Sequence, residues 1–164
     1  MLRQASEGTI RTTSMSMLII LAAVFLNFVL SVIGLTQALA DFVTGLGISP
    51  MQTMLVIVLV LLIVGCFMET LSMLLTTAPL LAPIVIALGF DPVWFGILLM
   101  VLLETALITP PIGINLYVVQ GVRERGEIVD VMIGAAPFVV TMVGMIGLLL
   151  AFPQIALWLP EQFY

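Results

Sequence analysis

The sequence contains no histidine and no lysine, and only four basic residues stand against nine carboxylates, which gives a formal net charge of -5. Such a chain offers no basic patch, so nucleic-acid binding is excluded. The lack of imidazole excludes histidine proton relays and histidine metal sites, so a coupling ion would need oxygen ligands, which favours sodium. The single cysteine, Cys66, cannot form a disulfide within the chain and is expected to pack as a small hydrophobic side chain.

Charge of either sign is scarce, because only 8% of the 164 residues are charged whereas 63% are hydrophobic. A soluble domain needs many more charges on its surface, whereas long apolar blocks can be solvated directly by a bilayer. The composition therefore predicts an all-α, multi-pass membrane protein. No cleavable signal peptide is expected before the first membrane segment.

Residues 1–50 are predicted to form a membrane helix followed by an interfacial helix. The apolar run 15–35 is long enough to cross roughly 30 Å of hydrocarbon, and Asn27 is its one strongly polar side chain. In residues 36–47, apolar side chains recur at spacings of three or four, as is typical of a short amphipathic helix.

Residues 51–122 are predicted to contain a spanning helix, a re-entrant hairpin and a broken helix. Residues 51–67 are apolar enough to span. In the next segment Thr76, Thr77, Pro79 and Pro83 interrupt an apolar stretch, leaving two arms of about ten residues that are each too short to cross. This pattern predicts a re-entrant hairpin with the two threonines at its tip, and such a tip is allowed only where it lines a site.

The double proline Pro110-Pro111, followed by Gly113, cannot continue a helix through residues 93–120. Each proline removes a donor and clashes with the preceding turn, so two half-helices joined by an unwound loop are predicted. The carbonyls freed in this way are good ligands for a hard cation.

Residues 123–164 are predicted to form a cytoplasmic loop, a last membrane helix and a periplasmic tail. Arg123 and Arg125 place the loop in the cytoplasm by the positive-inside rule. Three predicted crossings separate this pair from Arg3 and Arg11, so both pairs cannot be cytoplasmic under that count. We assign the cytoplasmic side to the second pair.

Two carboxylates, Glu69 and Glu104, lie in or near apolar segments, where burial costs a few kcal/mol unless the group is paired or wetted. Glu69 is either functional or simply interfacial, whereas Glu104, one turn before the break, is expected to support a site. An intramembrane hydrolase using both as acid and base is a weak alternative, because no nucleophile with its base accompanies them. No catalytic residue or enzyme activity is predicted.

Residues 65–122 resemble the large membrane subunit of tripartite ATP-independent periplasmic (TRAP) transporters. The resemblance runs through P-x-L-x-P-I (79–84), G-F-D-P-V-W-F-G (89–96) and T-P-P-I-G-I-N-L (109–116), and extends more weakly over 12–160. It corresponds to the second of the family's two inverted repeats, so the chain is expected to be a fragment or the product of a split gene.

The resemblance implies the second half of an elevator-type transporter, with sodium bound between a hairpin and a broken helix. Carried over by position, the sodium ligands would be Gly65, Ala106, Thr109 and Ile112, mainly through backbone oxygens. Ala106 stands where the family often has glycine. The residues implied to shape the site are Thr76, Thr77, Glu104, Pro110, Pro111, Gly113 and Asn115.

The family also implies a function and partners. It implies sodium-coupled import of small organic acids, such as C4-dicarboxylates or sialic-acid-like carboxylates, across the bacterial inner membrane. The partners would be a small membrane subunit and a periplasmic substrate-binding protein, and no cofactor beyond sodium is expected. A non-transporting scaffold subunit is the alternative, because the first repeat is missing from this sequence.

Overall fold

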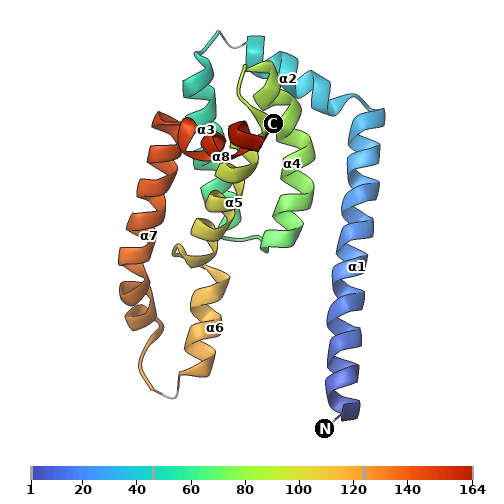
Figure 1. Cartoon of the computed structure of the whole chain (residues 1–164). Helices are drawn as coiled ribbons and strands as arrows, with labels where there is room; N and C mark the ends of the chain where they lie inside the picture. Colours follow the sequence, from blue (N-terminus) through green and yellow to red (C-terminus); the bar gives the residue numbers. More distant parts are fainter. Residues whose placement is uncertain (1, 46, 124, 164) are drawn as a thin grey trace.

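The computed structural model describes residues 2–45, 47–123 and 125–163, and within them every regular element is an α-helix (Figure 1). This arrangement confirms the predicted all-α class. The eight described helices are α1 (Leu2–Val32), α2 (Leu35–Gly45), α3 (Pro50–Gly65), α4 (Thr70–Ala87), α5 (Pro92–Ile108), α6 (Ile114–Val122), α7 (Ile128–Ala151) and α8 (Gln154–Phe163).

Three of the described helices, α1, α4 and α7, are long and apolar enough to cross a membrane. α1 is one continuous helix from Leu2, so the polar residues expected to precede the membrane helix in fact extend it. Two hydroxyls in this extension donate back to carbonyls four residues earlier, Thr12 to Gly8 and Ser16 to Thr12, both at 3.1 Å. A turn at Gly34, with φ of 70°, then leads into α2.

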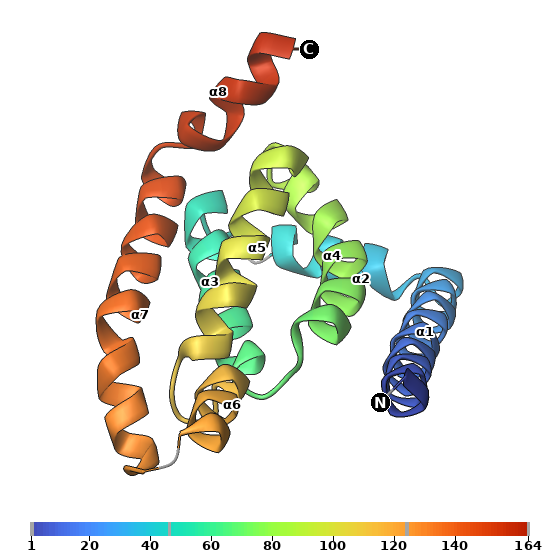
Figure 2. The same cartoon turned by 60° about the horizontal axis from the view of Figure 1, so that its bottom comes forward.

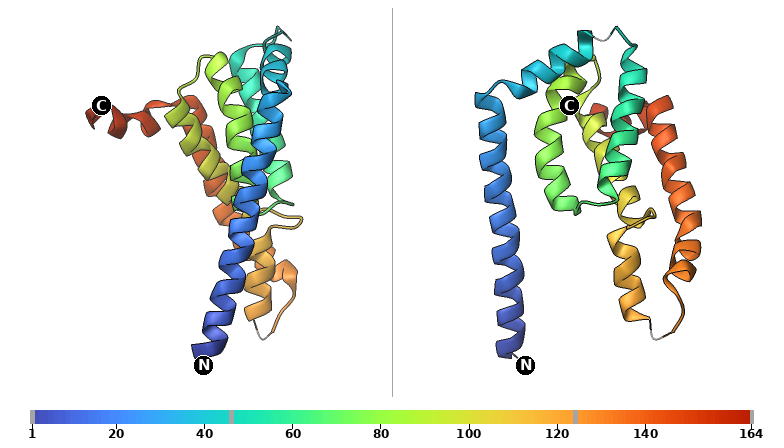
Figure 3. Two further views of the ribbon diagram at one scale, coloured as in Figure 1. Left: turned by 90° about the vertical axis from the view of Figure 1, so that its right-hand side faces the viewer. Right: turned by 180° about the vertical axis from the view of Figure 1, so that it is seen from behind.

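The helical hairpin lies one helix earlier than the sequence predicted. α3 begins at a capping box in which Ser49 and Gln52 exchange side-chain and backbone bonds. It runs to Gly65, turns, and returns antiparallel as α4 (Figures 1 and 3). α4 is continuous, so the prediction of a tip at Thr76 and Thr77 is wrong.

Prolines inside α4 misled the prediction, because the helix continues through both of them and a carbonyl that loses its donor is satisfied by a side chain of another helix. Pro79 has no N–H to offer the carbonyl of Leu75, four residues earlier. The Asn27 side chain of α1 donates to that carbonyl instead, at 2.8 Å. The helix continues through both prolines, and the two threonine hydroxyls donate back to carbonyls in the turn before them.

α5 is the central helix of the described structure, packed against α3, α4 and α7 (Figure 2). Asp91 caps its first turn through Val93 and Trp94, and Pro92 occupies the first helical position. The buried Trp94 donates its indole N–H to the carbonyl of Leu149 at 2.8 Å, which joins α5 to α7. α5 stops at Ile108, and α6 starts at Ile114, so the predicted helix break is confirmed.

The turn of the hairpin and the α5–α6 break lie at about the same level, well short of the end where the N-terminus and the α6–α7 loop are found (Figures 1 and 3). The hairpin therefore stops short of that end. α1 runs away from this end and the α5–α6 pair returns to it, so Arg3 and Arg11 lie toward the same end of the fold as Arg123 and Arg125 (Figure 1). The structure therefore places the two arginine pairs on one side, where the sequence had predicted opposite sides.

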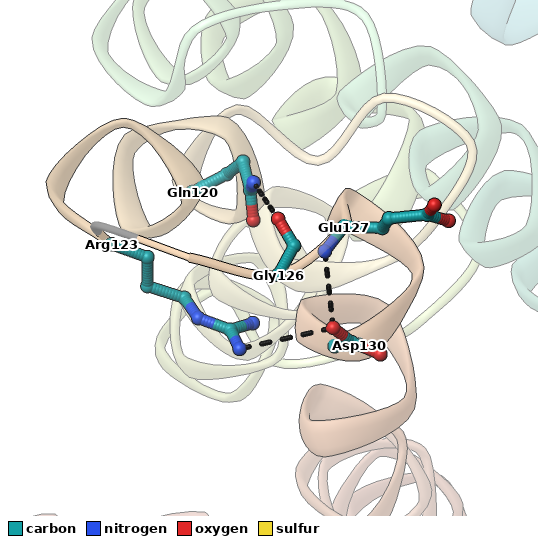
Figure 4. Close-up of polar contacts among 5 residues, drawn as sticks. All are labelled: Gln120, Arg123, Gly126, Glu127 and Asp130. Carbon is teal, nitrogen blue, oxygen red and sulfur yellow. Dashed lines mark hydrogen bonds and ion pairs between the residues drawn. The ribbon is translucent and has the colours of Figure 1, made fainter.

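The α6–α7 loop is closed by short polar contacts (Figure 4). Gln120 donates to the carbonyl of Gly126 at 2.8 Å, and the N–H of Glu127 donates to Asp130 at 3.0 Å. Arg123 lies 3.8 Å from the same Asp130 carboxylate. Gly126 has φ of 101°, and a side chain there would collide with both members of this ion pair, so glycine is required at the turn.

Candidate functional site at the hairpin tip and the helix break

The break in the fifth helix collects backbone oxygens. Pro110 and Pro111 deprive the carbonyls of Ala106 and Leu107 of their helical donors. The N–H of Thr109 turns back to Ala106 at 3.2 Å, and Thr109 itself is extended, as expected before a proline. The Ala106 carbonyl is thereby partly satisfied, whereas the carbonyls of Leu107 and Thr109 turn toward the unwound loop.

These two carbonyls converge on Gly113. A Cβ built on Gly113 would lie 2.9 Å from the Thr109 oxygen and 3.0 Å from the Leu107 oxygen, and the residue has φ of 41°. No side chain fits there. Leu107 was missed by the sequence analysis, although counting four residues back from Pro111 would have identified it.

Threonine hydroxyls line the same face of the helix end. Thr109 donates its hydroxyl hydrogen to the carbonyl of Thr105 at 2.6 Å, and Thr105 in turn donates to Val101 at 2.6 Å. Because the hydrogen of Thr109 is engaged, its oxygen keeps lone pairs that can accept a hydrogen bond or bind a cation. The hydroxyl is thus held in one orientation at the break.

The hairpin tip packs directly on this helix end. A Cβ on Gly65 would lie only 2.5 Å from the Cβ of the fully buried Ala106 and 3.2 Å from the sulfur of Met73. Glycine is therefore required where α3 passes α5. Cys66 and Pro110 both line a cavity of about 350 Å³ between the tip and the break.

Glu69 closes the hairpin as the N-cap of α4. Its two carboxylate oxygens accept from the backbone N–H groups of Leu71 at 2.9 Å and Ser72 at 3.0 Å, and the Ser72 hydroxyl adds a third bond. Glu69 therefore lies at the turn itself and holds the start of the returning helix.

The structure separates the residues expected to form one site. It brings together Gly65, Ala106, Thr109, Pro110 and Pro111, with Gly113 beside them. Of the other five, Thr76 and Thr77 are bonded within α4, the side chains of Ile112 and Glu104 are exposed, and Asn115 faces a cavity between α6 and α7.

Among the described residues, no three Asp, Glu, Cys or His side chains lie together as a metal-binding group. A cation at the break would therefore be held by neutral oxygens from carbonyls and the Thr109 hydroxyl. Hard monovalent and divalent cations accept such ligands. The arrangement of a hairpin tip against a helix break is also typical of ion and substrate sites in transporters.

A helical hairpin whose turn meets a broken helix among apolar helices places the chain in the class of membrane proteins with discontinuous helices, to which many secondary transporters belong. The family can be named as well. Residues 2–155 match the model of the tripartite ATP-independent periplasmic transporter, DctM component, and the chain belongs to this family.

Curated relatives agree with this assignment. The C4-dicarboxylate TRAP transporter large permease protein DctM of Rhodobacter capsulatus is 36% identical over 149 residues, which is 91% of this chain and 34% of the relative. The sialic acid TRAP transporter large permease protein SiaM of Vibrio cholerae is 35% identical over 159 residues, 96% of this chain and 36% of the relative. The 2,3-diketo-L-gulonate TRAP transporter large permease protein YiaN of Escherichia coli is 30% identical over 148 residues, 90% of this chain and 35% of the relative. The chain thus spans about a third of the length of these proteins.

Proposed function

We propose that this chain forms part of the large membrane subunit of a sodium-coupled transporter that imports small organic acids. The observation that supports this most directly is the contact of Gly65 with Ala106, which sets the hairpin tip against the oxygens of the helix break. The C4-dicarboxylate and sialic acid permeases among its relatives suggest carboxylate substrates. A small membrane subunit and a periplasmic binding protein would complete the transporter.

The sodium ion would bind between the tip and the break. Its ligands would be backbone oxygens of Gly65, Ala106 and Ile112, together with the backbone or hydroxyl oxygen of Thr109. The ion would hold the hairpin against α5, so that the two move together relative to α1 in an elevator motion. Glu104 would support the site from the exposed side of α5, where the rest of the transporter packs.

The orientation follows from the arginines at one end of the fold. With both pairs in the cytoplasm, α2 and α8 lie at the periplasmic side of a bacterial inner membrane. The opposite end would then receive substrate from the binding protein. A non-transporting scaffold subunit is the second candidate function.

The test is uptake of labelled C4-dicarboxylate and sialic acid, with and without sodium, by cells that express the complete transporter that contains this chain. We expect uptake that needs sodium. Thr109→Val should raise the sodium concentration for half-maximal uptake about tenfold, equal to roughly 1.4 kcal/mol, whereas Thr109→Ser should retain it. Thr141→Val is the matched control, because Thr141 bonds back to Pro137 on an exposed face of α7.

Uptake that is independent of sodium would refute the coupling. A response of Thr109→Val equal to that of Thr141→Val would refute the assigned site. The complete absence of uptake from a correctly assembled complex would favour the scaffold alternative.

A further inference from the structure

One long-range hydrogen bond joins the first helix to the hairpin. The Asn27 side chain donates to the carbonyl of Leu75 at 2.8 Å, across 48 residues of sequence. This carbonyl is available because Pro79 supplies no N–H to it. In an apolar environment an amide without a partner is costly, so the bond fixes the height of α4 along α1.

α4 carries a second carbonyl of the same kind. Pro83 stands four residues after Pro79 and removes the donor that would serve the Pro79 carbonyl. Residues four apart lie on the same face of a helix, about 6 Å apart along its axis. Since α1 and α4 are packed together and run in the same direction, the second carbonyl lies one turn farther along the same contact (Figure 1).

The space beside this second carbonyl is open. A cavity of about 370 Å³ lies between α1, α2 and α4, and Asn27, Ser31, Pro79 and Pro83 all line it. Gln37 of α2 contributes another polar side chain to its wall. Such a cavity can hold water that solvates the Pro79 carbonyl while Asn27 is bonded to Leu75.

We propose that Asn27 is a positioning residue for the hairpin, and that the two prolines give it two alternative acceptors. In the present structure Asn27 bonds to Leu75. In the second position α4 has shifted by one helical turn, about 6 Å, toward the N-terminal end of α1, and Asn27 bonds to the Pro79 carbonyl. Between these positions the amide faces neither proline-freed carbonyl, so the two heights are favoured over intermediate ones.

The shift would carry the hairpin tip along α1 without the loss of a hydrogen bond in either end state. The two-position contact itself requires neither ion nor substrate, and it rests on the proposed function only for its role in transport. It also explains why an apolar run contains a single asparagine at the height of a proline-freed carbonyl. If α4 had only one position, a single proline would be enough to free the one carbonyl to which Asn27 donates.

Pulsed electron-spin resonance on the full chain in lipid vesicles tests this inference. Spin labels at Thr13 of α1 and Ile86 of α4, both exposed, would be introduced with Cys66→Ala to remove the native thiol. Their separation lies largely along the helix axes. We expect two distances that differ by about 6 Å.

Pro83→Ala should leave only the distance of the present structure, because the new N–H at residue 83 occupies the Pro79 carbonyl. This substitution favours the helix, so it is expected to fold. Asn27→Leu should replace both sharp distances with one broad distribution. Pro137→Ala, which changes a proline inside α7 instead, should retain both distances.

A single sharp distance in the labelled chain would overturn the inference, as would two distances that survive Pro83→Ala unchanged. If Asn27→Leu does not insert into the membrane, Pro83→Ala still decides the matter. Sodium-independent uptake together with two distances that depend on Pro83 would refute the proposed coupling and support the two-position contact.

Discussion

Replacing Gly65 with alanine should separate the hairpin from the helix break. The added Cβ would lie 2.5 Å from the Cβ of Ala106, whereas carbon atoms in contact prefer about 3.5 to 4.0 Å. α3 and α5 would have to move apart by about 1 Å. Overpacking of this kind costs about 1 to 3 kcal/mol, which lowers the melting temperature by roughly 2 to 12 °C at this chain length.

The swap Gly65→Ala with Ala106→Gly separates this explanation from general damage. It moves the methyl group from one side of the contact to the other, so it should recover most of the lost stability. The remaining neighbour is the sulfur of Met73 at 3.2 Å, which ends a flexible side chain and can shift. The double variant should also regain the sodium response that Gly65→Ala loses.

Thermal unfolding with a thiol-reactive dye measures these effects, because Cys66 is the only cysteine and is 5% exposed. Gly96→Ala is the matched control, since Gly96 lies in α5 with no neighbour within 4 Å of a new Cβ. An unchanged melting temperature for Gly65→Ala would refute the close contact. A swap no better than the single variant would show that the two residues are not coupled.

Two further predictions concern the contact between α5 and α7 and the side of the membrane on which the arginines lie. Trp94→Phe loses the hydrogen bond to the Leu149 carbonyl and should lower the free energy of unfolding by about 1 kcal/mol. Trp158 is 64% exposed, so Trp158→Phe is the control and should leave the stability unchanged. Equal melting temperatures for the two variants would contradict the role of the buried indole. In a chain with Cys66→Ala, the variants Arg11→Cys and Arg125→Cys should both react with a membrane-impermeant thiol reagent added to the same side of the membrane. Labelling of the two variants from opposite sides would contradict a topology in which the chain crosses the membrane twice between residues 11 and 125.

The helix break could be predicted from the sequence because its cause is local. Pro110 and Pro111 remove donors wherever they stand, and Gly113 supplies the conformation that the return to a helix requires. The contact of Gly65 with Ala106 could not be read in the same way. It depends on how closely α3 and α5 approach, which no spacing within either helix reveals.

The sequence by itself determined the membrane class, the run of helices and the interruption at 109–113, since hydropathy and missing donors act over a few residues. Only the tertiary structure decided where the hairpin turns and which arginines share one end of the fold. Pro79 signals a break from within its own segment, yet the helix continues, and Asn27, 48 residues away, satisfies the freed Leu75 carbonyl. A partner that distant in sequence has no local signature, so the turn at 66–69 and the shared side of the arginines emerged only from packing.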